Sequence, residues 1–136
     1  MKVGITVVQH FKLLADISRA RILMLLDKRE LCVCQIMGVL GMSQPLVSRN
    51  LLLLIKAGYL LRRREGKMMF YTVCPNLPKP QSVLIEMLRQ ELSASRQIKK
   101  DLRSLKGCTE YQKKTGKCDM QTYLAYMRRK KQWGKN

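Results

Sequence analysis

The sequence predicts a mainly α-helical fold that carries one β-hairpin, and three observations lead to this prediction. Two short helical segments, 31–40 and 43–57, are separated by a tight turn. A strand-turn-strand pattern at 59–73 follows directly behind them. A long amphipathic stretch at 83–105 comes next. Helix, turn, helix and hairpin in this order are typical of a winged helix-turn-helix, in which the hairpin is the wing.

Two further helices are predicted before this unit. Apolar residues recur at near-helical spacing between Val7 and Leu14. A second apolar run, 22–26, follows a candidate capping residue, either Asp16 or Ser18. Both helices precede the polar segment that starts at Asp27.

The third and fourth helices have recognisable ends. The third covers 31–40 and is stopped by Gly41, a residue that suits the position beyond a helix C-terminus. Ser43 is the predicted cap of the fourth, with Pro45 in the first turn, where a missing N–H costs nothing. That helix is expected to end at Ala57-Gly58.

The strands and the C-terminal part complete the division of the chain. Two strands, 59–64 and 68–73, flank a turn that contains Gly66. We expect residues 1–106 to form the winged helix-turn-helix domain, and 107–136 to form a basic, cysteine-containing tail that is loosely structured or helical.

Charge narrows the class of partner. The chain has 136 residues, with 27 Lys and Arg against 9 Asp and Glu, and a formal charge of +18 spread over both halves. Such charge suits a polyanion or an anionic membrane surface. No apolar run approaches the roughly 18 to 20 residues of a spanning helix, and no signal peptide is evident. We therefore expect a cytoplasmic protein without a membrane partner, whose five cysteines are reduced thiols.

A family resemblance becomes specific at three motifs. These are Glu30-Leu31-Cys32-Val33-Cys34, Ser43-Gln44-Pro45-Leu46-Val47-Ser48 and Ala57-Gly58. Together with Leu13-Leu14-Ala15-Asp16 they resemble the arsenical-resistance repressors of the ArsR/SmtB family. The resemblance implies a homodimer formed through the first and last long helices, binding double-stranded operator DNA. Ile17 and Asn50 differ from the Pro and His that the family commonly carries.

The cysteine pair Cys32 and Cys34 is the candidate ion sensor. Soft thiolates select thiophilic ions. Side chains two apart on a helix do not face each other, so both sulfurs reach one ion only if the first helical turn opens. The alternative is that both are small buried hydrophobic residues.

The family's arsenite sites use three thiolates, and the third ligand is open. Cys108 or Cys118 could complete the site, or both could be incidental thiols of the tail. Met37 is one turn further along the helix but cannot supply negative charge, so we expect it in the core. Cys74 is expected to serve packing.

Two groups of residues are the candidate DNA contacts. Those at the start of the fourth helix face base edges or the backbone, and those around the hairpin face phosphates or the minor groove. Arg49 is the best candidate for a guanine contact; the alternative for each residue is a solvated surface. The residues are Ser43, Gln44, Pro45, Ser48, Arg49, Asn50, Arg62, Arg63, Arg64 and Lys67.

The predicted function is a transcriptional repressor that leaves its operator when arsenite or antimonite binds, with no permanent cofactor. Alternatives are release by cadmium or lead, or by thiol oxidation or reactive sulfur. Zinc or nickel sensing is disfavoured because His10 is the only histidine. A DNA-organising protein without an effector is a further rival. No constellation of an enzyme is found, so we predict that the chain is not one.

Overall fold

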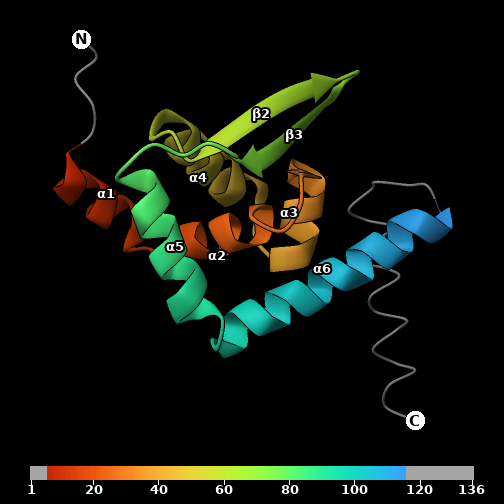
Figure 1. Cartoon of the computed structure of the whole chain (residues 1–136). Coiled ribbons are helices and arrows are strands. Elements are labelled where there is room, and N and C mark those ends of the chain that lie inside the picture. The colour runs from red at the N-terminus through yellow and green to blue at the C-terminus, as the bar shows by residue number, and fades with distance from the viewer. Residues whose placement is uncertain (1–5, 116–136) are drawn as a thin grey trace.

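The computed structural model describes residues 6–115, in which a small sheet lies at one edge of a group of helices and its hairpin protrudes (Figure 1). The elements in chain order are α1 (Val7–Leu14), α2 (Ile17–Leu26), β1 (Leu31–Cys32), α3 (Val33–Leu40), α4 (Gln44–Lys56), β2 (Leu60–Glu65), β3 (Met68–Val73), α5 (Gln81–Leu92) and α6 (Arg96–Thr115). The winged helix-turn-helix predicted from the sequence is therefore confirmed.

Helix ends follow the local chemistry of the sequence. Asp16 caps α2, its carboxylate accepting a hydrogen bond from the Arg19 N–H at 3.1 Å. Gly41 ends α3 with φ 69°, in the left-handed region that only glycine adopts at little cost. Ser43 then caps α4 by accepting a hydrogen bond from the N–H of Leu46. The turn of the helix-turn-helix is thus fixed at both sides.

The sheet contains one strand that the sequence did not predict. Its order is β1-β3-β2, and both pairings are antiparallel. Strand β1 has only two residues, of which Leu31 pairs with Tyr71 and Cys32 with Phe70. Two residues are too few to show strand alternation, and both are buried. We expected these residues in the third helix, which instead begins at Val33.

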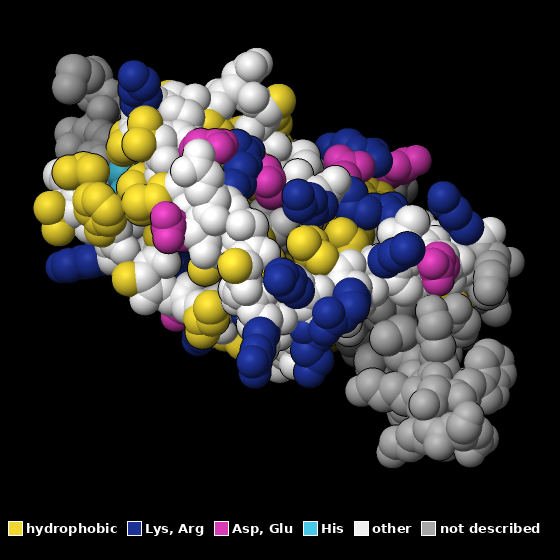
Figure 2. All heavy atoms as spheres, turned by 60° about the horizontal axis from the view of Figure 1, so that its bottom comes forward, with side chains coloured by type: hydrophobic (Ala, Val, Ile, Leu, Met, Phe, Trp, Pro, Cys, Tyr) yellow, Lys and Arg dark blue, Asp and Glu magenta, His cyan; other side chains and the backbone are white. Residues whose placement is uncertain are grey.

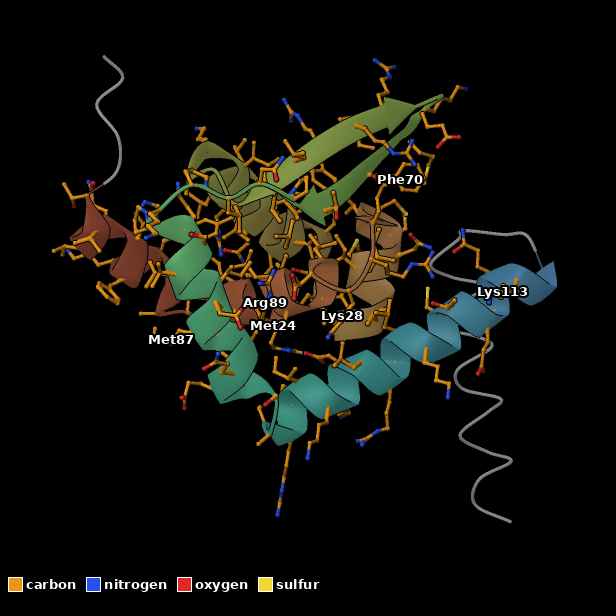
Figure 3. All side chains as sticks on the ribbon, viewed as in Figure 1. Met24, Lys28, Phe70, Met87, Arg89 and Lys113 are labelled. Atoms are coloured by element: carbon orange, nitrogen blue, oxygen red, sulfur yellow. The ribbon has the colours of Figure 1, made fainter. Side chains whose placement is uncertain are left out.

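The predicted C-terminal helix is two helices. Helix α5 ends at Leu92. The Ser95 hydroxyl then accepts a hydrogen bond from the Ile98 N–H at the start of α6. Helix α5 is held on α2 by the ion pair of Arg89 with Asp27, 2.7 Å long, and Arg89 is labelled in Figure 3. Helix α6 runs without interruption through residue 106 to Thr115.

The core lies where α2 is enclosed by α3, α4, the sheet and α6. Its largest fully buried side chains include Ile22, Leu23, Leu25 and Tyr59. No single helix of residues 6–115 is both long enough and apolar enough to span a membrane; α3 and α4 meet those criteria only as a pair bent by 115°.

Candidate functional site

The start of α4 presents a polar surface to solvent. Val47, Leu51 and Leu54 face the core, and this fixes the opposite side of the helix outward. Five of the six α4-region residues predicted to contact DNA are exposed there: Ser43, Gln44, Pro45, Ser48 and Arg49. These side chains need no rearrangement to meet a groove.

Asn50 lies on the other side of the helix. Its side chain is 2% exposed, and its amide oxygen accepts a hydrogen bond from the Arg19 guanidinium at 3.2 Å. Arg19 also donates to the carbonyl of Leu13. Asn50 thus joins α4 to α2 and does not share the exposed face, contrary to the expectation that it faces base edges. Its neighbours in the sequence gave no sign of this partner, because Arg19 is distant along the chain.

The wing carries four basic residues with different surroundings. Arg62, Arg64 and Lys67 are exposed. Arg63 is exposed as well, but it makes hydrogen bonds to Glu30, 2.8 Å at the shortest from its Nε, and to Glu65 at 2.8 Å. Its guanidinium also lies 4.8 Å from the centre of the Phe70 ring. These bonds raise the pKa of Arg63, and the hydrogen bond with Glu30 has the largest effect. Arg63 therefore braces the wing against the loop before β1.

The two neighbouring cysteines occupy different places at the start of α3. Cys32 is 1% exposed, at the end of β1, and its N–H donates to the Gln35 side chain at 3.1 Å. Cys34 is half-buried in the first turn of α3. The irregular junction of strand and helix, rather than a regular helix, thus separates the two thiols.

Cys108 lies on α6 and is buried, and its thiol shares the Gln35 side chain with the N–H of Cys32. Burial is the main cause that raises the pKa of the Cys108 thiol. The charge of Arg29 lowers it, Cys32 raises it, and a hydrogen bond with the Gln35 side chain lowers it. The fold therefore brings together two cysteines that are far apart in the sequence.

Hydrogen bonds join α3 to α6 around this pair. The Gln35 amide donates to the Gln112 side chain at 3.0 Å, and Arg29 donates to Gln112 at 3.4 Å and to the Thr109 hydroxyl at 2.6 Å. Sequence reasoning missed Gln35, Gln112 and Arg29, because polar residues on two separate helices give no pattern that pairs them.

The remaining candidates fall elsewhere. Cys118 lies outside the described residues. Cys74 follows β3, and its N–H donates to the carbonyl of Tyr59 at 2.9 Å, closing the base of the wing. Within residues 6–115, no group of three or more His, Cys, Asp or Glu side chains is arranged to hold a metal ion. A site with three ligands therefore requires rearrangement or residues beyond this range.

An apolar surface formed by α1 and α5 is a second exposed feature. Val7, Val8 and Phe11 of α1 and Val83 and Met87 of α5 are each between 47% and 58% exposed. Figure 2 shows hydrophobic side chains gathered at the end of the molecule where α1 lies. Below these residues, the buried His10 ring is 2.9 Å from the Tyr59 hydroxyl, which secures α1 to the core.

Comparison with known proteins identifies the family. A family model described as "Bacterial regulatory protein, arsR family" matches residues 16–61. The arsenic resistance transcriptional regulator ArsR2 of Pseudomonas putida is 44% identical over 88 residues, which cover 64% of this chain and 74% of that protein. The chain belongs to the ArsR family. The match includes the helix-turn-helix and both cysteines at the start of α3.

Other similar proteins match only part of this ArsR-family chain. The arsenical resistance operon repressor of Escherichia coli is 46% identical over 72 residues, or 52% of this chain; the chain thus spans 62% of that relative's length. Among solved structures, HlyU from Vibrio cholerae has a TM-score of 0.56 at 29% identity, covering 64% of this chain and 91% of HlyU. The repressor BigR from Xylella fastidiosa, at 24% identity and a TM-score of 0.57, covers 66% and 86% and shares the fold.

Family membership confirms the class predicted from the sequence. The family and these relatives are DNA-binding regulators of transcription, not enzymes. The identity of an effector and of its ligands is a separate question, which depends on the cysteines of this chain.

Proposed function

We propose that this ArsR-family protein is a cytoplasmic, homodimeric repressor that releases operator DNA when a thiophilic ion binds Cys32, Cys34 and Cys108. The observation that carries the proposal is that the buried Cys108 of α6 and the buried Cys32 meet at one side chain: the Cys32 N–H donates to Gln35 of α3, and the Gln35 side chain also makes a hydrogen bond with Cys108. It supports Cys108, rather than Cys118, as the third thiolate.

DNA binding in this proposal uses the exposed start of α4 and the wing. Gln44, Ser48 and Arg49 read base edges in the major groove, with Ser43 and Pro45 near the backbone. Arg62, Arg64 and Lys67 neutralise phosphates. Arg63 acts indirectly, because its guanidinium is already engaged by two carboxylates.

The proposed dimer forms through the apolar surface of α1 and α5. A two-fold interface brings the same surface of each protomer together, and burying the five side chains removes apolar area from water. This proposal keeps the first helix that the family resemblance implies for the dimer, and it uses α5 in place of the single long C-terminal helix that the sequence predicted.

Ion binding is proposed to open the first turn of α3. The turn must open because Cys34 lies on the helix beyond Cys32 and the described residues hold no preformed three-ligand group. Movement at α3 and α6 reaches the DNA-binding helix through Arg21, which donates to Asp101 of α6 and to the carbonyl of Leu40, both at 2.9 Å. Leu40 ends α3, immediately before the turn into α4. The bound ion thereby favours a dimer with lower affinity for DNA.

Arsenite and antimonite are the proposed effectors because three thiolates without histidine suit a trivalent thiophilic ion. Arsenite, as As(OH)₃, condenses with three thiols and releases three water molecules, with no net release of protons. The names of two relatives refer to arsenic resistance.

Cadmium and lead are the alternative effectors. A cadmium resistance regulator is also a relative, at 35% identity. Cadmium displaces thiol protons on binding, so its affinity should rise with pH whereas that of arsenite should not.

The test is fluorescence anisotropy of a duplex from the gene's own promoter, bound by reduced protein and titrated with arsenite, antimonite, cadmium and zinc. Cys32→Ser, Cys34→Ser and Cys108→Ser should each bind DNA normally and fail to release it. Cys74→Ser is the matched control and should respond like the wild type. Release from a Cys32→Ser or Cys34→Ser variant would contradict the proposed sensor, and release from Cys108→Ser alone would remove Cys108 as a ligand.

Thiol oxidation is the second candidate, favoured because Cys32 and Cys108 are both buried and both reach the Gln35 side chain. Peroxide would convert the two thiols into one disulfide while it is reduced to two water molecules. The burial of both thiols and the raised pKa of Cys108 oppose rapid oxidation, because the thiolate is the reactive form. Release by peroxide that a dithiol reductant reverses, without any effect of arsenite, would favour this function over ion sensing.

A further inference from the structure

An open pocket of about 250 Å³ lies between the start of α3 and the wing, and residues of the two sulfur-containing types, Cys and Met, line it from the two elements. Cys32 and Cys34 contribute from the strand-helix junction, and Met68 and Met69 from β3. Lys67 and Tyr71 also line it. The proposed function uses the two cysteines but leaves the two methionines without a role.

The sheet register explains why the methionines meet the cysteines. Cys32 pairs with Phe70, which is labelled in Figure 3. In an antiparallel pair the numbers run in opposite directions, so residues 33 and 34 would pair with Met69 and Met68 if β1 continued. The partner does not continue as a strand, because the chain turns into α3 at Val33. Met68 and Met69 therefore lie opposite the first turn of α3, which contains Cys34.

The donor set favours one class of ion. Thiolate and thioether sulfurs are soft ligands and select soft cations such as Cu⁺; Ag⁺ has the same charge and closed d shell. A thioether is neutral, so two thiolates and one monovalent ion leave one negative charge. The Lys67 ammonium at the same cavity can balance it. A trivalent ion needs a third thiolate, and the cavity lining contains only two cysteines.

We propose that Cys32 and Cys34, together with Met68 or Met69 of the wing, form a thiolate-thioether site for a soft monovalent cation. On binding, both thiols lose their protons to solvent and two sulfur-metal bonds form, with the thioether as an additional neutral ligand. The inference rests on the proposed function for the two thiolates, but it replaces Cys108 by the wing as the further ligand. An ion held in this way links the wing directly to the start of α3.

The first experiment identifies the ligands in reduced, DNA-free, full-length protein. Methionine methyl groups are labelled with ¹³C and the nine methionine signals are followed by NMR as silver nitrate is added in chloride-free buffer. The resonances of Met68 or Met69 should shift at one equivalent, together with the appearance of thiolate-to-metal absorbance in the ultraviolet. Absorbance without a shift of either methionine would overturn the proposal.

The second experiment measures affinity for Ag⁺ by competition with a chromophoric chelator. Loss of the thioether ligand should weaken binding by about tenfold or more, the scale seen when groups supporting a metal site are removed. The expected loss appears in Met68→Leu or Met69→Leu, or more strongly in the double variant. Met37→Leu is the matched control, because Met37 is half-buried on α3 but does not line the cavity. Equal affinity of the double variant and the control would overturn the proposal.

Arsenite release by the same variants separates this inference from the proposed function. If the double methionine variant loses Ag⁺ affinity but still releases DNA with arsenite, both are supported. If no ion releases DNA from any protein but the methionine signals shift with Ag⁺, the metal site is supported and the proposed function fails. If arsenite acts normally and Ag⁺ binds without the methionines, only this inference fails.

Discussion

The start of α4 and the contact between α3 and α6 both adjoin α3 but differ in how their residues are held. At α4, the candidate DNA contacts are exposed. At the α3–α6 contact, Cys32 and Cys108 are buried, and Gln35, Gln112 and Arg29 connect the two helices by hydrogen bonds. In the proposed function, the first region meets DNA as it stands, whereas the second must break these contacts before an ion can be surrounded. The proposal therefore makes the DNA-binding state the resting state, and the ion must supply the free energy to leave it.

Arg21 connects the two regions, so the largest effect is expected there. The Asp101 side chain is 4% exposed and pairs with Arg21. Asp101→Ala leaves the guanidinium without its charged partner and should lower the free energy of unfolding by about 3 kcal/mol, the lower end for a broken buried pair. Urea unfolding of the DNA-free protein measures this. Glu86→Ala, which removes an exposed partner of Arg89, should lower the free energy of unfolding far less, because solvent screens an exposed ion pair. Equal losses of unfolding free energy in the two variants would contradict the prediction that the buried Arg21–Asp101 pair stabilises the fold more than an exposed pair does.

The next effect concerns the exposed region alone. Arg49→Ala should weaken operator binding by about 1–3 kcal/mol and relax the preference for one base pair, as expected for a lost base contact. Arg62→Ala should instead weaken binding to the operator and to a random duplex alike. It should also lower the slope of log affinity against log salt concentration by about 1, the release of one counterion. Anisotropy titrations at several salt concentrations distinguish the two. A uniform loss for Arg49→Ala would reassign that residue to a phosphate contact.

Local signals in the sequence predicted the exposed region well. Ser43, Pro45 and Gly41 set the ends of α3 and α4 by their own backbone preferences, so they are recognisable without tertiary structure. Asn50 was misplaced because its partner Arg19 comes from another helix. Exposure of a helix position depends on what packs against it, and a polar residue gives no sign of a buried polar partner.

The buried region was predictable only in part. The Cys32 and Cys34 pair was evident, but the proximity of Cys108 arises from packing of α6 against α3. The break at Ser93–Ser95 was missed because apolar residues on both sides keep a helical spacing, with Leu88 and Leu92 before it and Ile98 and Leu102 after it all packed against the same core. A two-residue strand such as β1 has no period to detect.

A smaller effect tests whether the hydrogen bonds between α3 and α6 resist opening. Gln112→Ala removes the acceptor of Gln35 and Arg29 and should lower the free energy of unfolding by about 1 kcal/mol. Because these bonds must break before the site opens, the variant should bind arsenite several times more tightly, about 1 kcal/mol in a linked equilibrium. DNA affinity without the ion should stay within twofold. Gln90→Ala, on the exposed side of α5, is the control. Unchanged arsenite affinity in Gln112→Ala would place the opening elsewhere.

The smallest effect should appear at His10, which lies outside both regions. Burial lowers the pKa of His10 from its usual 6.5, so the unfolded chain binds a proton more readily than the folded chain. Stability from this residue is therefore complete above about pH 6.5 and is lost as the pH falls toward the lowered pKa. Protonation also places a charge beside the Tyr59 hydroxyl in a buried site. Urea unfolding between pH 5 and 8 should show a slope for the wild type that is smaller in His10→Gln, after comparison of both proteins at pH 8. The hydrogen bond of the His10 side chain goes to Tyr59 and not to the residues around the thiols, so arsenite affinity measured at the same pH should not differ between the two proteins. A difference would mean that α1 is coupled to the α3–α6 contact.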